Sequence, residues 1–221
     1  MSDLPKTIPY YLAEQIQRGI VRGRYPPGSN LREMDLGAEY GSSRGPVREG
    51  LRLLELQGLV VHAPRRGFRV ATYSEAEIAH LYRLRALLEG FVIEALEGKV
   101  TGAFTDALDQ VNKRMKAFAD AGDIDGYFDQ NIAFHQMIID QAESPALTRV
   151  LSIANDMSLP LRYMLLSQDF PKNNDFDYHR KIVNAIRGGN FPQARQLTED
   201  HILDNLPKVL RSYRRIAQEK S

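Results

Sequence analysis

The sequence predicts a mainly α-helical protein in two parts: three short helices with a β-hairpin, and then an antiparallel bundle of helices. Three observations predict this fold. Apolar residues recur at helical spacing along most of the 221 residues. Two β-prone runs around a turn interrupt that pattern once, near 59–71. The net charge changes from +4 over residues 1–72 to −3 over residues 73–221, so we place the domain boundary there.

The N-terminal part is expected to begin with two helices. The first spans about 9–22, because apolar residues recur there every four positions: Leu12, Ile16 and Ile20. The stretch GRYPPGSN then forms a turn rich in proline and glycine. A short helix over about 32–40 follows and stops at Gly41.

The third helix contains the stretch SSRGPVREGL, in which two arginines stand one turn apart beside a Gly-Pro pair. Proline is tolerated in the first turn of a helix, where backbone N–H groups are unpaired in any case. Pro46 therefore predicts a helix that starts near Arg44, with the hydroxyl of Ser43 as its N-cap. Gly58 predicts its end near Gln57. The helix buries one apolar stripe and exposes arginines at four-residue intervals: Val47, Leu51 and Leu54 inside, and Arg44, Arg48 and Arg52 outside.

A hairpin after this helix completes the N-terminal part. The runs LVVHA and FRVA flank the turn PRRG, which places Arg65 and Arg66 at its tip. A short helix, a tight turn and a second helix with an exposed N-terminus form a helix-turn-helix, and the hairpin is then a wing. This part holds ten arginines and one lysine against seven acids. Arginine suits bidentate recognition of phosphate or guanine, although a solvated helix face has similar charge.

The C-terminal part is predicted to be a bundle of six antiparallel helices, separated by Gly, Asp, Asn or Pro. Pro160 and Pro207 lie inside two of them and are expected to kink or divide those helices. The expected spans are about 74–98, 102–120, 123–141, 145–167, 173–187 and 191–217.

The composition excludes several classes of protein. The chain has no cysteine, which rules out disulfides and thiolate metal sites and fits a reducing compartment. The N-terminus has no apolar signal core, and no segment approaches 18 uninterrupted apolar residues. We therefore expect a cytoplasmic protein with no membrane partner.

The motifs of the N-terminal part resemble those of a known family. A PG turn, an LRE helix, the stretch SRGPVREGL, GLV and the wing RRGFRV follow in the order found in GntR-type bacterial transcription regulators. The helical remainder looks like the ligand-sensing FCD domain of the FadR branch, in its six-helix, VanR-like variety. The resemblance implies a homodimeric regulator, more often a repressor, which binds a roughly palindromic site in double-stranded DNA.

The resemblance also assigns residues to DNA binding. Arg48 is expected to donate two hydrogen bonds to guanine, and Arg44 to contact a base or a phosphate. The wing arginines suit phosphate or the minor groove. The alternative is that the helix arginines pair with Glu49 and Glu55 on a solvated surface. The full candidate set is Arg32, Ser43, Arg44, Pro46, Arg48, Arg65, Arg66 and Gly67.

Four positions depart from the usual family pattern. Gly37 and Gly50 stand where the family generally has alanine, Ser42 where it has valine, and Gly45 where it has threonine. A glycine inside a helix costs about 0.5–1 kcal/mol relative to alanine, so we expect a slightly less stable DNA-binding domain. The absent side chain at Gly45 removes one usual contact to DNA.

Three histidines of the helical part are candidates for a metal site. Asn131 and His135 lie four residues apart on one helix face, and the next two helices bring His179 and His201. These positions resemble a site of one acid and three histidines in the FCD family, with Asn131 at the acid position. Asp129 cannot replace it, because it lies about 200° around the helix. The expected cofactor is a divalent ion, Zn²⁺ or Ni²⁺. His62 and His80 have no such support.

The effector is expected to be a small carboxylate, because an amide ligand leaves the metal site with excess positive charge. Candidate residues for this ligand are Tyr82, Arg85 and Arg162, although Arg85 also has Glu89 four residues away as a partner. Two other functions remain open. A metal-dependent hydrolase lacks an HExxH-type general base here. A metal sensor without an organic effector is the other alternative.

Overall fold

The computed structural model describes residues 7–168, 170 and 174–219. These residues form two compact units: one contains the described residues up to 74 together with Asn155–Leu161, and the other contains Glu75–Ala154 and the described residues from Arg162 onward. Within the described ranges, no helix is long and apolar enough to cross a membrane.

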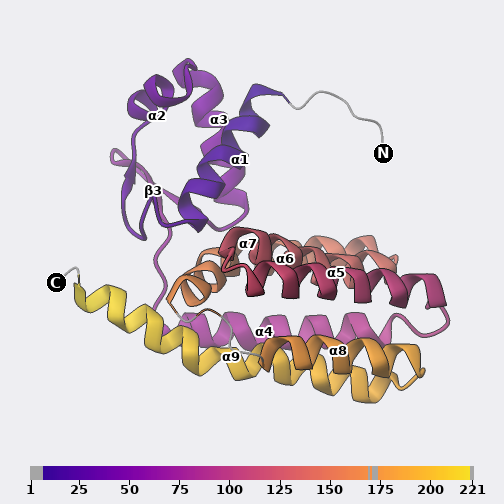
Figure 1. The fold of residues 1–221 in the computed structure, drawn as a ribbon. Helices are drawn as coiled ribbons and strands as arrows, with labels where there is room; N and C mark the ends of the chain where they lie inside the picture. Colours follow the sequence, from indigo (N-terminus) through magenta and orange to yellow (C-terminus); the bar gives the residue numbers. More distant parts are fainter. Residues whose placement is uncertain (1–6, 169, 171–173, 220–221) are drawn as a thin grey trace. The chain divides into compact units, whose positions relative to one another are not determined.

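The N-terminal unit has the predicted three helices and a small antiparallel sheet (Figure 1). The sheet has the order β1-β3-β2, with Val61 opposite Arg69 and Leu31 opposite Phe68. Strand β1 was not predicted, because two residues have no periodicity to detect. The elements are α1 (Ile8–Val21), β1 (Asn30–Leu31), α2 (Glu33–Tyr40), α3 (Arg44–Leu56), β2 (Val60–Ala63) and β3 (Gly67–Val70).

Helix α3 starts at Arg44 and has Ser43 at its N-cap position, as predicted, but the predicted capping hydrogen bond is wrong. Ser43 occupies the N-cap position, and its side chain makes no capping hydrogen bond. A capping hydroxyl accepts from the N–H of the second or third helical residue. Pro46 is the third residue of α3 and has no N–H, so only the N–H of Gly45 remains of these two donors. At the other end of the helix Gly58 adopts the predicted left-handed conformation, with φ 75°.

The predicted apolar stripe of α3 forms the centre of the N-terminal core. Val47, Leu51 and Leu54 are each 0% exposed. Helix α3 packs on α1, and a Cβ on Gly50 would come within 3.0 Å of the carbonyl oxygen of Pro9. This glycine therefore lets the two helix backbones approach closely, which offsets its expected cost in helix stability.

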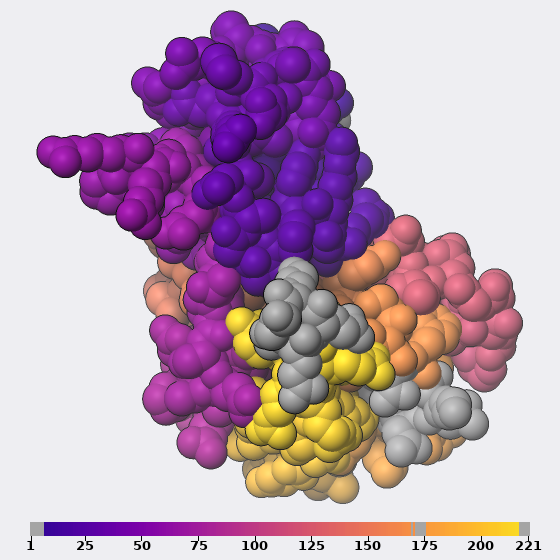
Figure 2. Space-filling view, turned by 90° about the vertical axis from the view of Figure 1, so that its left-hand side faces the viewer, coloured from indigo at the N-terminus to yellow at the C-terminus, as the bar shows by residue number. Residues whose placement is uncertain are grey.

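The wing projects from the N-terminal unit (Figure 2). Ala63 pairs with Gly67 at the end of the ladder, and Arg65 has a left-handed backbone with φ 64° in the turn between them. The predicted hairpin, with Arg65 and Arg66 exposed at its tip, is confirmed.

The C-terminal unit is a bundle formed by the six predicted helices, except for residues 155–161 of the fourth (Figure 1). Helix α4 packs along α9 and also contacts α6, and α5 contacts α6 and α8. Pro160 and Pro207 do not divide their helices, and residue 173, the expected start of α8, lies outside the described residues. The helices are α4 (Glu75–Glu94), α5 (Gly102–Asp120), α6 (Ile124–Gln141), α7 (Pro145–Gln168), α8 (Asn174–Arg187) and α9 (Phe191–Glu219).

Candidate functional site

Four arginines line one groove of the N-terminal unit, which has a volume of about 620 Å³. It runs from the start of α2 past the start of α3 to the wing, and it brings together four of the predicted DNA-binding residues: Arg32, Arg44, Arg66 and Gly67. The groove also contains Arg69, which sequence reasoning missed. The pairing of β1 with β3 places Arg69 opposite Asn30, and this pairing was not visible in the sequence.

The two arginines at the start of α3 share one acidic partner, Glu33 of α2. Both terminal oxygens of Glu33 accept from Arg48, at 2.7 Å from Nε and 2.9 Å from Nη2. Arg44 lies 3.4 Å from the same carboxylate. The predicted alternative partners are therefore wrong for these two arginines, and Glu55 instead pairs with Arg52 at 2.6 Å.

The hydrogen bonds from Arg48 lower the pKa of Glu33, against a smaller opposing effect of burial. One carboxylate thus faces two guanidinium groups on an exposed surface. Ser43, Gly45 and Pro46 stand beside them at the helix start, and a Cβ on Gly45 would meet open space. Such a surface, with further arginines in the groove and the wing, is suited to a polyanion.

A second candidate site lies inside the bundle, where three buried histidines converge from α6, α8 and α9. His135, His179 and His201 each offer a ring nitrogen, and these atoms lie within 4.8 Å of one another. The Nε2 atoms of His179 and His201 are 3.1 Å apart. The predicted convergence of the three imidazoles is therefore present, whereas His62 and His80 are exposed elsewhere.

Glu89 of α4 orients one of these histidines. Its Oε2 lies 2.9 Å from Nδ1 of His135, and its Oε1 accepts from Arg85 at 2.7 Å. The predicted pairing of Arg85 with Glu89 is confirmed. Burial alone would raise the pKa of Glu89, but Arg85 and His135 together hold it below its usual value. Sequence reasoning missed this contact of Glu89 with His135. Because Nδ1 of His135 faces Glu89, Nε2 is the ring nitrogen that remains for a metal.

Burial favours the neutral form of all three imidazoles. Burial is the largest cause in each case: it lowers the pKa of His135 and of His179, and it lowers the pKa of His201 to about 3. Neutral imidazole is the form that binds a metal. Two nitrogens 3.1 Å apart are close enough to bind one ion at about 2.0–2.1 Å each, so the three histidines fit a divalent metal.

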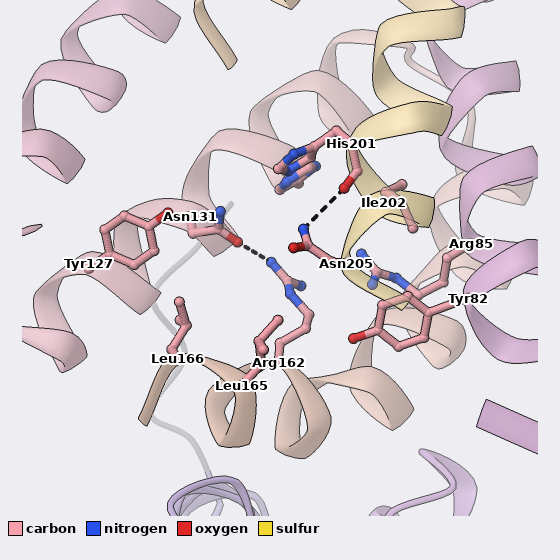
Figure 3. A pocket seen from close by; sticks show the side chains of 11 residues that line it. Tyr82, Arg85, Tyr127, Asn131, Arg162, Leu165, Leu166, His201, Ile202 and Asn205 are labelled. Atoms are coloured by element: carbon pink, nitrogen blue, oxygen red, sulfur yellow. Dashed lines mark hydrogen bonds between the residues drawn. The ribbon is translucent and has the colours of Figure 1, made fainter. Parts of the chain in front are cut away.

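The fourth predicted ligand is engaged elsewhere. Oδ1 of Asn131 accepts a hydrogen bond from Nη2 of Arg162 on α7 (Figure 3). Asn131 lines the same cavity as His135 and His201, while Asp129 is exposed, as the helix geometry predicted. The arrangement therefore offers three imidazole ligands, with the amide oxygen held by a cation.

The cavity beside the histidines has a volume of about 50 Å³. Figure 3 shows Arg162 and Tyr82 pointing into this space from α7 and α4. The hydroxyl of Tyr82 is buried and has no hydrogen-bond partner among the described residues. No carboxylate occurs among the described residues that line the cavity. These residues are Tyr82, Arg85, Tyr127, Asn131, His135, Arg162, Leu165, Leu166, His201, Ile202 and Asn205.

Arg162 carries the least compensated charge of this cavity. Burial, and then repulsion from Arg85, lower its pKa to about 10, which leaves it protonated at pH 7. Its hydrogen bond to Asn131 pairs it with a neutral amide rather than with an acid. A buried cation in this state is stabilised by any anion that reaches it.

Comparison with known proteins gives a consistent result for both units. The family model "Bacterial regulatory proteins, gntR family" matches residues 11–70, and the FCD domain model matches residues 80–204. The gluconate operon transcriptional repressor of Bacillus subtilis is 33% identical over 183 residues, which cover 80% of this chain and 74% of that protein. A probable D-xylose utilization operon transcriptional repressor of Paenarthrobacter nicotinovorans is 27% identical, over 93% of this chain and 90% of that protein.

Two solved structures share the fold. Escherichia coli McbR/YncC superposes with a TM-score of 0.82 at 17% identity, over 94% of this chain and 99% of that chain. A putative regulator from Rhodococcus superposes with a TM-score of 0.75 at 22% identity, over 91% and 97%.

Proposed function

Because this chain belongs to the GntR family of bacterial regulatory proteins and carries an FCD domain, we propose that it is a repressor whose DNA binding responds to a small carboxylate. The family consists of DNA-binding transcription regulators and not of enzymes, so the hydrolase alternative is set aside. The observation that carries the effector part of the proposal is the cavity of the C-terminal unit, where Arg162 faces a neutral amide and a tyrosine hydroxyl.

The proposed DNA contacts follow from the chemistry of each arginine. Arg48 is exposed at the start of α3, where a recognition helix meets base edges, so we assign it to a guanine. Arg44 and the other groove arginines, Arg32, Arg66 and Arg69, suit phosphate, because they outnumber Glu33, the one acid among the described residues that line this open groove. Arg65 extends this surface at the wing tip.

The effector is proposed to bind Arg162 through its carboxylate. A carboxylate forms a stronger, charge-assisted pair with a guanidinium than the amide of Asn131 does. The hydroxyl of Tyr82 is available to donate to the same ligand. A cavity of about 50 Å³ has room for roughly four water-sized groups, so a short carboxylate fits without rearrangement and a sugar acid requires the cavity to open.

A metal held by His135, His179 and His201 is proposed to sit beside this ligand. Bound there, a divalent ion would supply a further positive charge and open coordination positions for ligand oxygens. The ring of His135 is held in place by Glu89, and such a carboxylate partner is common behind metal-binding histidines.

Regulation requires two copies of the chain, and α4 offers a surface for the second. Leu84, Leu87 and Phe91 lie on one face of α4 and are 48%, 55% and 52% exposed. A patch of large apolar side chains on one helix face is typical of an interface between subunits. We therefore propose a homodimer in which twofold symmetry matches a palindromic site. A ligand alters DNA affinity only by favouring one spacing of the two recognition helices.

Replacing Arg48 with alanine is expected to weaken binding to a DNA site selected from a random pool by about 1–3 kcal/mol, and to relax the preference for one base pair. The physical reason is the loss of two hydrogen bonds to one guanine. Fluorescence anisotropy at fixed salt measures both effects. Glu49→Ala, on the same helix, is the control. An unchanged affinity of Arg48→Ala would remove the base-reading role.

Replacing Arg162 with glutamine is expected to weaken carboxylate binding without loss of stability, because the change removes a poorly compensated buried charge. Acetate, lactate and gluconate serve as probes in calorimetry with the full-length protein. At least one of them should bind the wild type and bind Arg162→Gln about tenfold more weakly or worse. Arg149→Gln, at an exposed position of the same helix, should bind as the wild type does. Equal binding by Arg162→Gln would contradict the assignment.

The metal site predicts about one divalent ion per chain in the purified protein, measured by elemental analysis. The ion should be lost in His201→Gln and retained in His80→Gln, because His80 is exposed and far from the cluster in sequence. DNA release on removal of the ion alone would favour a metal sensor over a carboxylate sensor. Equal metal content in the two variants would overturn the site.

A further inference from the structure

We propose that Glu33 is a positioning residue for base recognition: it holds one edge of the Arg48 guanidinium and leaves the opposite edge to meet a guanine. The proposal rests on the base-reading role of Arg48 proposed above. Glu33 belongs to α2, outside the set of residues that the sequence assigned to DNA.

The contact between the two residues uses a defined edge of the guanidinium. Oε1 of Glu33 accepts from Nε of Arg48 at 2.7 Å, and Oε2 accepts from Nη2 at 2.9 Å. A guanidinium has five N–H groups, and this pairing uses two of them. The remaining edge has one N–H on Nη1 and one on Nη2, pointing in parallel. That pair matches the O6 and N7 acceptors of guanine in the major groove.

The environment of the pair supports this division of the two edges. The side chain of Glu33 is 15% exposed, whereas that of Arg48 is 56% exposed, so the carboxylate lies inside the surface and the guanidinium reaches outward. Glu33 is the first residue of α2, and its backbone is therefore fixed by the helix. A long arginine side chain that is already held loses less conformational freedom on binding DNA.

Glu33 also contacts Arg44, at 3.4 Å, and so it sets the positions of both guanidinium groups at the start of α3. One carboxylate carries a single negative charge and cannot neutralise both guanidinium groups. The surface therefore keeps its attraction for DNA while the acid fixes the direction of Arg48. A carboxylate repels the phosphates of any duplex, so the loss of its charge alone would strengthen binding to every sequence. Weaker binding to the selected duplex only would therefore indicate that the carboxylate positions Arg48.

The test compares Glu33→Gln with Asp35→Asn in the full-length protein. Asp35 is exposed in the same first turn of α2, so both changes remove one negative charge from one helix end, and in the described part of the chain Asp35 pairs with neither arginine. Affinities are measured at fixed salt for a selected duplex and for a scrambled one. Thermal unfolding checks that all variants fold.

We expect Glu33→Gln to bind the selected duplex about three- to tenfold more weakly and the scrambled duplex as well as or better than the wild type does. Asp35→Asn should change both affinities by the same factor. In an Arg48→Ala background, Glu33→Gln should have no further effect on the ratio of the two affinities, because the carboxylate acts through Arg48.

Three results would overturn the proposal. Tighter specific binding by Glu33→Gln would make the carboxylate an inhibitor of Arg48, and an effect equal to that of Asp35→Asn would reduce it to a nearby charge. An undiminished effect in the Arg48→Ala background would show that Glu33 acts through another residue. If Arg48→Ala alone binds the selected duplex as the wild type does, the base-reading function fails together with this inference.

Discussion

In both candidate sites of this protein, two guanidinium groups lie near a single carboxylate. Glu33 contacts Arg48 and Arg44 at the DNA-binding surface, and in the bundle Glu89 pairs with Arg85 while Arg162 lies nearby beside a neutral amide. We propose that the excess positive charge determines what each site binds. At the exposed surface, water screens the excess positive charge, and a polyanion can replace that water. In the bundle, burial of the excess charge destabilises the protein until an anion binds beside it.

The same constraint would connect the proposed metal site to the proposed ligand site. Glu89 divides its two oxygens between Arg85 and His135, so the residue that compensates one arginine also orients a histidine. Asn131 has no charge to offer either a metal or Arg162. A carboxylate ligand would therefore satisfy the guanidinium and release the amide oxygen, which lies beside the histidine cluster. Ligand and metal are expected to support each other's binding by this exchange.

Features that depend on local spacing could be predicted from the sequence. The buried stripe of α3, the hairpin and the pair Arg85–Glu89 follow from periodicity or from separations of four residues. The family resemblance supplied the convergence of the histidines. The contact between Arg48 and Glu33 spans fifteen residues and depends on the angle between two helices, so no spacing rule reveals it. The capping hydrogen bond predicted for Ser43 is absent, and Pro46 leaves only one of the two N–H groups that such a cap uses.

The most direct test of the account is whether the outward edge of Arg48 meets the acceptors of one guanine. Each guanine of a selected duplex is replaced in turn by 7-deazaguanine, which lacks N7, and the affinities of wild type and Arg48→Ala are compared. The account predicts one position per half-site where the wild type loses about tenfold in affinity and Arg48→Ala loses nothing. An equal loss in both proteins at every position, or no loss in either, would contradict it.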